Sequence, residues 1–456
     1  MEHIFRAYDI RGKFPDELTP EVVRGIGYFL GKRIEGPVLV TYDVRPSSPI
    51  LFEWLVEGLT GAGREVIFGG VVPTGTNYFG NFYPVEVEGR EVRVGGGIQI
   101  TGSHNPPAYN GFKITINRYP FYGEELKELG REVMANLNSH PVGKKEYKVT
   151  DLKGRYISHL VKEFSHLKGV EIDGVFDPGN GAVGVLLREL LERLGVKRWK
   201  IICEEPDGSF PCHHPDPSDP ANLEQIIETM EEEGYRHGFA FDGDGDRLGF
   251  LEKWGEEIKV YSGDELLFLL ASHLNSPKTI VDVKTSQAII DKLKEKGEVL
   301  LSKTGHSNLK VLLYKTGAHL AGEVSGHLFF HDRYIGVDDG VYGALRVMEL
   351  IAKGAKFREL LAQLPPIITS NEEKIGVEES RKFQIVEELK RRLKEKKEEL
   401  GVVEIVEVDG VRVHFSDGWG LVRASNTTPT LTMRFEASTE ERLKEIRNLF
   451  LSLLPV

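Results

Sequence analysis

The chain has 456 residues, more than one ordinary hydrophobic core accommodates, which predicts three or four domains. Its 70 acidic against 58 basic side chains give a formal net charge of −12, so we expect neither nucleic acid nor an anionic membrane as a partner. The start of the chain lacks the charged-then-apolar pattern of a signal peptide, and no apolar run reaches the length of a membrane span, which predicts a cytoplasmic protein.

Three segments repeat one design: an apolar strand that ends in Asp, a polar loop, an amphipathic helix, a Gly and a second apolar strand. The first segment begins with Val38–Asp43, the second with Val175–Asp177 and the third with Thr279–Asp282. Strand, helix and strand in this order predict right-handed crossovers and active loops at the carboxyl ends of mainly parallel strands. We therefore expect three similar α/β domains with mixed sheets.

The pattern changes from about Ile368. A strand is followed by a long charged helix over Arg381–Leu400, by strands at Val402–Val408, Val411–Phe415 and Leu431–Glu436, and by a final helix. This order predicts a C-terminal α+β domain whose antiparallel sheet carries helices on one face. The expected domains span residues 1–150, 151–255, 256–367 and 368–456.

The two cysteines, Cys203 and Cys212, lie nine positions apart next to two Glu and two His residues, a pattern open to zinc or to a disulfide. A structural zinc site usually has two paired ligand clusters, which this segment lacks. Because Cys203 ends the apolar stretch Trp199–Ile202, we favour a buried thiol that packs as a small hydrophobe.

The loop Thr101-Gly-Ser-His-Asn-Pro106 follows the Gly-rich apolar strand Val94–Ile100, and its Ser103 is a candidate nucleophile. An α/β-hydrolase elbow is excluded, because that motif needs Gly two residues on either side of the serine. A serine in a Gly/Asn/Pro turn more often bonds nearby backbone only. This motif alone therefore leaves both interpretations open.

The loop Asp242-Gly-Asp-Gly-Asp246-Arg247 lies between two apolar strands. Its carboxylates at i, i+2 and i+4 point the same way from an extended chain and supply hard oxygen ligands for a divalent cation. An EF-hand is excluded, because its sixth and twelfth positions hold Arg247 and Lys253. Three carboxylates leave coordination positions for a phosphate oxygen, which favours Mg²⁺ over an acidic surface turn with unrelieved charge repulsion.

Two further loops carry polar groups suited to a phosphosugar. The Glu and Ser of Gly322-Glu-Val-Ser-Gly-His327 can reach sugar hydroxyls, although alone this segment is better interpreted as a plain turn. The loop Arg423-Ala-Ser-Asn-Thr-Thr-Pro429, with Arg434 on the following strand, can clamp a phosphate through bidentate guanidinium groups. A polar turn between strands is the alternative for the latter.

Together and in this order, the four loops resemble those of the α-D-phosphohexomutase superfamily, and the similarity extends over essentially the whole chain from Phe5–Gly12 onward. The resemblance implies that Ser103 carries a phosphoryl group and, with Asp242, Asp244 and Asp246, holds Mg²⁺. It implies catalytic roles for Lys113, Arg247 and His306, of which Lys113 and His306 are candidate general bases. The implied substrate-binding residues are Tyr8, Arg11, His104, Lys284, Glu323, Ser325, His327, Arg423, Ser425, Asn426 and Thr427, to which Arg434 is added for its charge.

The implied activity is an isomerase of carbohydrate metabolism, an intramolecular phosphotransferase that interconverts hexose 1-phosphate and hexose 6-phosphate. The route passes through phospho-Ser103 and a hexose 1,6-bisphosphate, which also acts as activator. Many relatives have Gly-Thr-Glu where this chain has Asn426-Thr-Thr428, and the version found here is similar to that of enzymes that accept both mannose and glucose. A phosphoglucosamine mutase is the alternative. The partner is a small phosphosugar, and a homo-oligomer stays open.

Other classes of protein compete with this interpretation. Gly179-Asn-Gly-Ala-Val-Gly184 follows a strand, opens a helix and has Glu204 twenty residues beyond it, which matches a dinucleotide fingerprint and suggests an NAD-dependent oxidoreductase. That hypothesis leaves the other loops unexplained. A noncatalytic sugar-phosphate-binding protein would not need Ser103, and a phosphatase would release inorganic phosphate.

Overall fold

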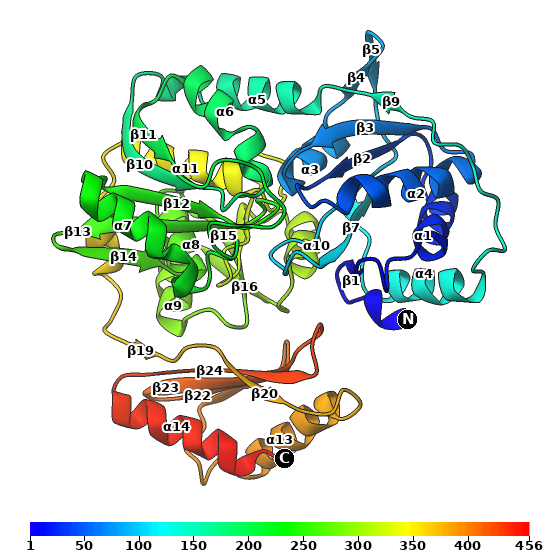
Figure 1. The fold of residues 1–456 in the computed structure, drawn as a ribbon. Coiled ribbons are helices and arrows are strands. Elements are labelled where there is room, and N and C mark those ends of the chain that lie inside the picture. The colour runs from blue at the N-terminus through cyan, green and yellow to red at the C-terminus, as the bar shows by residue number, and fades with distance from the viewer. Residues whose placement is uncertain (456) are drawn as a thin grey trace. The chain divides into compact units, whose positions relative to one another are not determined.

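The computed structural model describes residues 1–455 and divides into two compact units (Figure 1). The first contains Met1–Leu270 and Ser325–Lys356, and the second contains Ala271–Val324 and residues 357–455. Among the helices of the described residues, none has both the length and the apolar character needed to cross a bilayer.

A mixed seven-stranded sheet opens the first unit. Its central strand β2 (Val38–Tyr42) pairs in parallel with β3 and β6, while β7 pairs antiparallel with β6. The order is β1 (Ile10–Lys13), β7 (Tyr109–Ile116), β6 (Gly96–Ile100), β2, β3 (Val66–Val71) and β9 (Lys148–Val149), with β8 (Tyr119–Pro120) on β7. The same part of the chain, up to residue 149, also contains η1 (Glu2–Ile4), α1 (Pro20–Arg33), α2 (Ser48–Gly61), α3 (Thr74–Phe82), the hairpin of β4 (Val85–Val87) and β5 (Arg90–Val92), and α4 (Glu124–Ala135).

This sheet forms because its strands are apolar on both faces and its helices are amphipathic. Residues of β2 and β6 are almost fully buried, as expected of parallel strands covered on both faces. Helix α1 begins where the Thr19 hydroxyl accepts the Val22 N–H and Pro20 occupies the first turn. Its buried face joins one core cluster with α2 and α4.

A second mixed sheet in the first unit has the order β11 (Lys197–Ile201), β10 (Glu171–Asp177), β12 (His237–Phe241), β13 (Leu248–Trp254) and β14 (Glu257–Tyr261). Strand β10 is parallel to both neighbours, and β12, β13 and β14 are antiparallel. The associated helices are α5 (Leu152–Glu163), η2 (Ser165–Leu167), η3 (Ala182–Val185), α6 (Leu187–Leu194), η4 (Pro220–Leu223), α7 (Glu224–Glu233) and α8 (Gly263–Ala271). The unit also includes β18 (Leu328–Phe330) and α11 (Gly340–Ala352), which contacts β10 and β13.

In the second unit, β15 (Lys278–Asp282) pairs in parallel with β16 (Glu298–Ser302) and β17 (Leu320–Gly322), alongside α9 (Gln287–Lys296) and α10 (His306–Thr316). An antiparallel sheet follows, in the order β19 (Ile368–Thr369), β24 (Thr430–Ala437), β23 (Gly418–Ala424), β22 (Val411–Phe415) and β21 (Glu404–Val406), with β20 (Glu373–Gly376) on β24. Helix α12 (Phe357–Leu361) precedes this sheet in the chain, and the helices that pack on it are α13 (Lys382–Glu395) and α14 (Glu440–Leu453). Figure 1 shows α13 and α14 on the same side of this sheet, and both contribute to its core.

The predicted fold class is confirmed, including the C-terminal antiparallel sheet. The structure corrects three details of that segment. The charged helix ends at Glu395 rather than Leu400, the strand expected over Val402–Val408 is limited to Glu404–Val406, and β23 was not predicted. The charge-rich stretch after Glu395 turns instead of continuing the helix.

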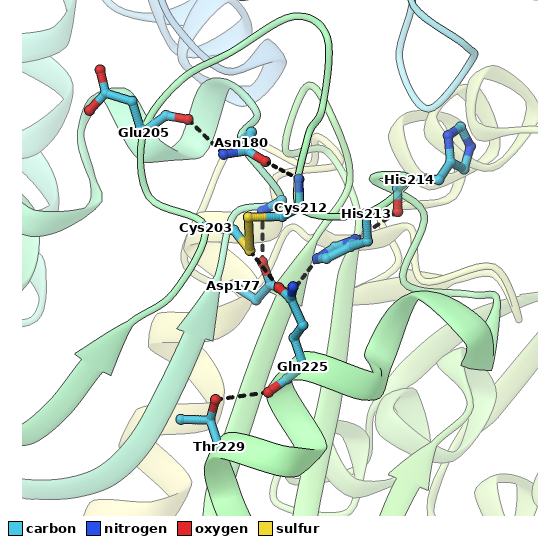
Figure 2. The surroundings of a disulfide bond; sticks show 10 residues. Asp177, Asn180, Cys203, Glu205, Cys212, His213, His214, Gln225 and Thr229 are labelled. Carbon is cyan, nitrogen blue, oxygen red and sulfur yellow. Dashed lines mark hydrogen bonds and ion pairs between the residues drawn. A yellow bond between two sulfur atoms is a disulfide. The ribbon is translucent and has the colours of Figure 1, made fainter.

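The prediction for the cysteines was wrong. Cys203 and Cys212 form a disulfide at the end of β11 (Figure 2). Both are half-buried, and Cys203 has a left-handed backbone (φ 47°) that turns it out of the strand. It therefore cannot pack as a buried hydrophobe in line with Trp199–Ile202.

Candidate active site

Ser103 lies in the loop from β6 to β7, residues 101–106, which we call the Ser103 loop. The residue is 4% exposed and has φ +54°, a left-handed conformation that an L residue adopts only when its surroundings impose it. Its N–H donates to the Thr101 hydroxyl at 2.8 Å, and its Oγ lies 3.2 Å from His104 Nδ1. The tight turn therefore fixes the position of the hydroxyl.

Arg45, in the loop after β2, supports the Ser103 loop from inside the protein. Its guanidinium donates to the carbonyls of Ser103, Asn105, Pro106 and Tyr109 at 2.7–3.3 Å, and its side chain is fully buried. Gly102 permits this approach, because a Cβ there would lie 2.4 Å from the guanidinium. Several charge-assisted bonds thus hold the loop in one conformation.

Asp43 completes this support. Its carboxylate accepts from the Arg45 Nε at 3.1 Å, from the Thr101 hydroxyl at 2.9 Å and from the Gly102 N–H at 3.1 Å. Sequence reasoning placed Asp43 at a strand end but assigned no role to it or to Arg45. Their position in the sequence could have indicated this role. They follow the buried strand β2, and the loops after parallel neighbours such as β2 and β6 lie at the same edge of the sheet.

The three Asp residues of residues 242–247, the Asp loop, lie together between β12 and β13. Their side chains are fully buried, and one carboxylate oxygen from each lies within 4.8 Å of the others. The Oδ1 atoms of Asp244 and Asp246 are buried and accept no hydrogen bond within the described residues. Buried carboxylate oxygens that converge without a donor fit a hard divalent cation, so this donor set suits Mg²⁺.

Lys113, on β7, supplies positive charge to the same cluster. Its Nζ lies 2.7 Å from Asp244 Oδ2 and 2.6 Å from Asp246 Oδ2. Burial alone would lower the pKa of Lys113, but the carboxylates of Asp244, Asp246 and Asp242 raise it above the usual range. Burial, and then the neighbouring carboxylates, raise the pKa of Asp242 well above its ordinary value.

The Ser103 loop and the Asp loop meet backbone to backbone. A Cβ on Gly243 would lie 2.2 Å from the carbonyl oxygen of Ser103. The hydroxyl of Thr74, at the start of α3, donates to Asp244 Oδ2 at 2.5 Å, and its N–H donates to the Asp244 carbonyl. The fold therefore brings together the predicted nucleophile and the predicted metal ligands, which are about 140 residues apart in sequence.

Arg247 joins this cluster to a carboxylate that sequence reasoning missed. Its N–H and Nε donate to Asp242 at 3.1 Å, its Nη1 lies 3.3 Å from Asp216, and its buried Nη2 has no partner in the described residues. Burial would raise the pKa of Asp216, but Arg247 and then His104 lower it below the usual range. Burial, and then the charge of Arg247, lower the pKa of His104 well below its usual value.

Other predicted residues of the first unit lie around these loops. Arg11 donates to Asn105 Oδ1 at 2.8 Å and pairs with Asp9, which ties β1 to the Ser103 loop. His327 Nδ1 lies 3.0 Å from Asp338 and 3.9 Å from Asp246 Oδ2, and the carbonyl of Ser325 accepts from Arg247 at 3.5 Å. Tyr8 is half-buried three residues before Arg11. Asp338 was not predicted.

The second unit holds the remaining predicted residues. Lys284 Nζ lies 3.3 Å from Glu372, and its carbonyl accepts from Arg434, so these two predicted residues meet. Glu323 is 3% exposed and accepts the Gly305 N–H at 2.7 Å. That bond fixes the turn from which His306 begins α10 with a half-buried ring.

The loop after β23 forms the polar turn expected of a phosphate clamp. Ser425 Oγ accepts the N–H groups of Thr427 and Thr428 at 3.3 and 3.2 Å, while Asn426 is half-buried and Thr427 is exposed. Arg423 Nε donates to Asp409 Oδ2 at 3.0 Å. The same oxygen accepts the Thr304 N–H, so Asp409, another residue missed from sequence, orients the guanidinium.

The dinucleotide hypothesis fails on the structure. The Ala182 N–H donates to the Gly243 carbonyl, and a Cβ on Gly181 would lie 2.6 Å from that oxygen. The last glycine, Gly184, packs against the Glu204 carbonyl and lies inside the short 3₁₀ helix η3, while the α-helix α6 begins only at Leu187, after the motif has ended. The glycines therefore serve internal packing and do not leave a helix N-terminus for a pyrophosphate.

Comparisons with known proteins agree with this arrangement. Family models described as phosphoglucomutase/phosphomannomutase alpha/beta/alpha domains I, II and III match residues 2–139, 154–255 and 262–367, and the C-terminal domain model matches residues 372–452. The phosphomannomutase/phosphoglucomutase of Pseudomonas aeruginosa is 40% identical over 458 residues, which cover 98% of this chain and 94% of that protein. The phosphoglucomutase of Neisseria gonorrhoeae is 38% identical, with 99% and 96% covered.

A solved structure extends the similarity to three dimensions. The crystal structure of a phosphoglucomutase/phosphomannomutase family protein from Burkholderia thailandensis superimposes with a TM-score of 0.89 at 36% identity. The match covers 99% of this chain and 97% of that one. Sequence and fold therefore agree over the full length.

Proposed function

Because this chain belongs to the phosphoglucomutase/phosphomannomutase family, we propose that it interconverts the 1- and 6-phosphates of a hexose, mannose and/or glucose, through phospho-Ser103. The reaction is an intramolecular phosphoryl transfer, an isomerisation overall. A hexose 1,6-bisphosphate is the intermediate and, when supplied in trace amounts, the activator.

The observation that carries the proposal is the contact between the Ser103 loop and the Asp loop. A buried serine in a left-handed turn lies against Gly243, next to three buried carboxylates, two of which have an oxygen without a donor in the described residues. Phosphoryl transfer depends mainly on positioning and on charge stabilisation, and this arrangement supplies both. A noncatalytic binding protein would not need a serine held in this way.

We propose Mg²⁺ as the ion held by Asp242, Asp244, Asp246 and Ser103. When bound, the ion withdraws charge from the phosphoryl oxygens. The protein contributes its own cations to the same end, because the Lys113 ammonium and the Arg247 guanidinium lie on the carboxylates of the Asp loop. These fixed charges offset the negative charge that accumulates around a phosphoserine.

The two half-reactions then use the same groups in opposite directions. The bond from Ser103 Oγ to phosphorus breaks, a bond from phosphorus to the free sugar hydroxyl forms, and the hydroxyl proton is taken up by a base. After the bisphosphate turns round, its other phosphoryl group returns to Ser103 and the proton is given back. Because the raised pKa of Lys113 keeps its amine protonated, His306 is the better of the two candidate bases.

We assign recognition of the sugar phosphate to the remaining predicted residues. Glu323 and Ser325 would accept or donate bonds to sugar hydroxyls, and the turn held by Ser425 would bind the phosphate that is not transferred. That turn should recognise phosphate rather than one ring position, because each half-reaction presents the opposite end of the sugar. The same phosphate site would include Arg423, Asn426, Thr427 and, on strand β24, Arg434. The positions proposed to line the substrate path are Tyr8, Arg11, His104, Lys284 and His327.

Phosphorus NMR tests the proposal directly. The purified protein, with Mg²⁺ and a trace of hexose bisphosphate, is offered mannose, glucose and glucosamine 1-phosphates in parallel. We expect a 6-phosphate signal from mannose or glucose, and none with Ser103→Ala, while exposed Ser139→Ala converts like the wild type. Conversion of glucosamine 1-phosphate alone would favour the phosphoglucosamine mutase alternative.

Two other outcomes would overturn the proposal. Growth of inorganic phosphate without a 6-phosphate would indicate a phosphatase. Sugar-phosphate binding without conversion by folded wild-type protein would indicate a noncatalytic binding protein. The cytoplasmic location, the homo-oligomer, the absence of nucleic-acid or membrane partners and the domain limits at residues 150, 255 and 367 stay predictions.

A further inference from the structure

The disulfide lies within a set of metal-ligating side chains that is separate from the Asp loop. The Oδ atom of Asp177, the Sγ of Cys203 and the Nε2 or Nδ1 of His213 lie within 4.8 Å of one another, and Cys212 is bonded to Cys203 (Figure 2). Two sulfurs, one imidazole nitrogen and one carboxylate oxygen are a ligand set that suits tetrahedral zinc.

The imidazole of His213 is oriented as a metal-bound histidine would be. Its Nδ1 lies 2.9 Å from the His214 carbonyl, and its Nε2 faces Asp177 Oδ2 at 2.7 Å. The carbonyl accepts a hydrogen bond from the Nδ1–H group, so Nε2 is the atom that a cation can bind once its own proton has left. The other oxygen of Asp177 accepts the Gly179 N–H at 2.8 Å, which leaves Oδ2 directed toward the cluster.

The backbone holds the two cysteines near each other independently of the bond between their sulfurs. The Asn180 N–H donates to the Cys203 carbonyl at 2.9 Å, and its Oδ1 accepts the Cys212 N–H at 3.0 Å. Its amide also donates to the Glu205 carbonyl. A reduced pair would therefore stay within reach of one ion, since Asn180 keeps both ends of the loop in place.

We propose that the reduced protein binds a thiophilic divalent cation such as Zn²⁺ through Asp177, Cys203, Cys212 and His213, so that this position holds either a disulfide or a metal ion. A dithiol reductant transfers two electrons and two protons to the disulfide and becomes a cyclic disulfide itself. The two Cys thiols then each lose a proton to solvent as their sulfurs bind the ion. The Asp177–His213 pair opens to admit the ion, and the proton that Nε2 of His213 donates to Asp177 is also released to solvent.

Both the disulfide and a bound metal ion would join the two ends of the loop between Cys203 and Cys212. This loop contacts Arg45, which supports the Ser103 loop. A Cβ on Gly208 would lie 2.7 Å from Cα of Arg45, and the Arg45 guanidinium stacks on Phe210 at 5.1 Å from the ring centroid. Because a reducing compartment favours the dithiol form, a metal there would preserve a closure that the disulfide provides under oxidising conditions. Cys203, Cys212 and His213 are only half-buried, so an ion can reach them.

Cobalt spectroscopy of the full-length protein tests the inference without reference to activity. The reduced wild-type protein is first stripped of transition metals and zinc. It is then titrated with Co²⁺ under anaerobic conditions in the presence of excess Mg²⁺. We expect a near-ultraviolet thiolate-to-cobalt charge-transfer band and strong visible bands of tetrahedral cobalt, which Zn²⁺ then displaces. The oxidised protein should give neither, and cobalt in the oxygen-only Asp loop produces no sulfur band.

Variants separate the ligands from their neighbours. Cys203→Ser and Cys212→Ser should lose or weaken the sulfur band, and His213→Ala should shift the visible bands. His214→Ala removes only an exposed ring and should bind like the wild type. Absence of a sulfur band in the reduced wild type would overturn the proposal even if every variant failed to fold, and so would an unchanged band in the folded Cys203→Ser protein.

Discussion

Gly243 faces the carbonyl of Ser103 so closely that a Cβ at position 243 would lie 2.2 Å from that oxygen. Because both contacting groups are backbone, neither can move away by a side-chain rotation. We expect Gly243→Ala to displace Ser103 from the Asp loop and to lower turnover by about 100-fold, the usual effect of a misplacement of about 1 Å. Steady-state kinetics checks this against Gly376→Ala, where nothing lies within 4 Å. Normal turnover in Gly243→Ala would contradict the proposed role of the contact.

Arg45→Lys should destabilise the protein by about 2–4 kcal/mol, because an ammonium cannot reach all the carbonyls that the guanidinium bonds, and part of a buried network is left unpaired. Urea unfolding measures this change in the free energy of unfolding. Exposed Arg131→Lys, which retains its charge near Glu124, is the control and should change stability by less than about 0.5 kcal/mol. Equal stability of the two variants would show that Arg45 does not support the Ser103 loop.

Mg²⁺ should raise the melting temperature of the wild type, because an ion that binds only the folded state at about 100 times its dissociation constant adds about 2.7 kcal/mol. A chelator should abolish turnover, and added Mg²⁺ should restore it. Asp246→Asn removes one of the three converging carboxylates and should lose most of the thermal shift. Exposed Asp219→Asn is the control. A full shift in Asp246→Asn would place the ion elsewhere.

Asp409→Asn should raise the KM for hexose phosphates about tenfold with little change in kcat. Its carboxylate orients Arg423 and also accepts the Thr304 N–H, and the loss of one charge-assisted bond corresponds to about 1.4 kcal/mol. Initial rates over a range of substrate concentrations separate the two constants. Asp417→Asn, an exposed residue paired with Arg442, should leave both unchanged. A fall in kcat alone would argue against Arg423 as a binding group.

Asp339 predicts a component of the pH dependence of stability. Burial raises the pKa of its carboxyl to about 6, against the opposing hydrogen bonds from Tyr342, Tyr156 and Tyr334, while Asp338 raises it further. The folded protein thus binds this proton more tightly than the unfolded chain does. The stabilisation is full below the unfolded value of about 4, and about 3 kcal/mol is lost as the pH rises through about 6.

Urea unfolding at a series of pH values between about 4 and 7 checks the sign and size of this effect. Asp339→Asn keeps a group that can bond Tyr342 but does not titrate, so its stability relative to the wild type should increase across that interval. The free energy of unfolding of the exposed variant Asp291→Asn should change with pH in the same way as that of the wild type. A constant difference between Asp339→Asn and the wild type would mean that this carboxyl does not titrate as described.

The parts predicted from sequence are those set by local pattern. The buried parallel strand β2, the Asp loop between two apolar strands and the long amphipathic helix α13 follow from residues close together in the chain. Strand β23 was missed because Gly418 and Gly420 resemble a turn, whereas pairing with β22 and β24 keeps them extended. Tertiary pairing outweighs local propensity there.

The parts that were missed depend on contacts between distant residues. Arg45 bonds carbonyls about 60 residues away, and nothing in its neighbourhood distinguishes it from an exposed arginine. The disulfide depends on Asn180, which holds the segments that contain Cys203 and Cys212, so the spacing of the cysteines alone could not reveal it. The specific match of four ordered loops nevertheless singled out the nucleophile and the metal ligands on which the proposed reaction depends.

Arg412, on β22, limits how this protein can be divided or recombined. Its buried guanidinium donates to the carbonyls of Val283 and Thr285 and lies 3.8 Å over the ring of Trp419. A fragment cut at the predicted limit of residue 367 would remove both of these carbonyl acceptors and the apolar contact of Val283 with Trp419. Chimeras that exchange the C-terminal segment between relatives should therefore include the loop after β15 from the same relative. The buried contacts between that loop and β22 are then transferred together, although the two segments are far apart in sequence.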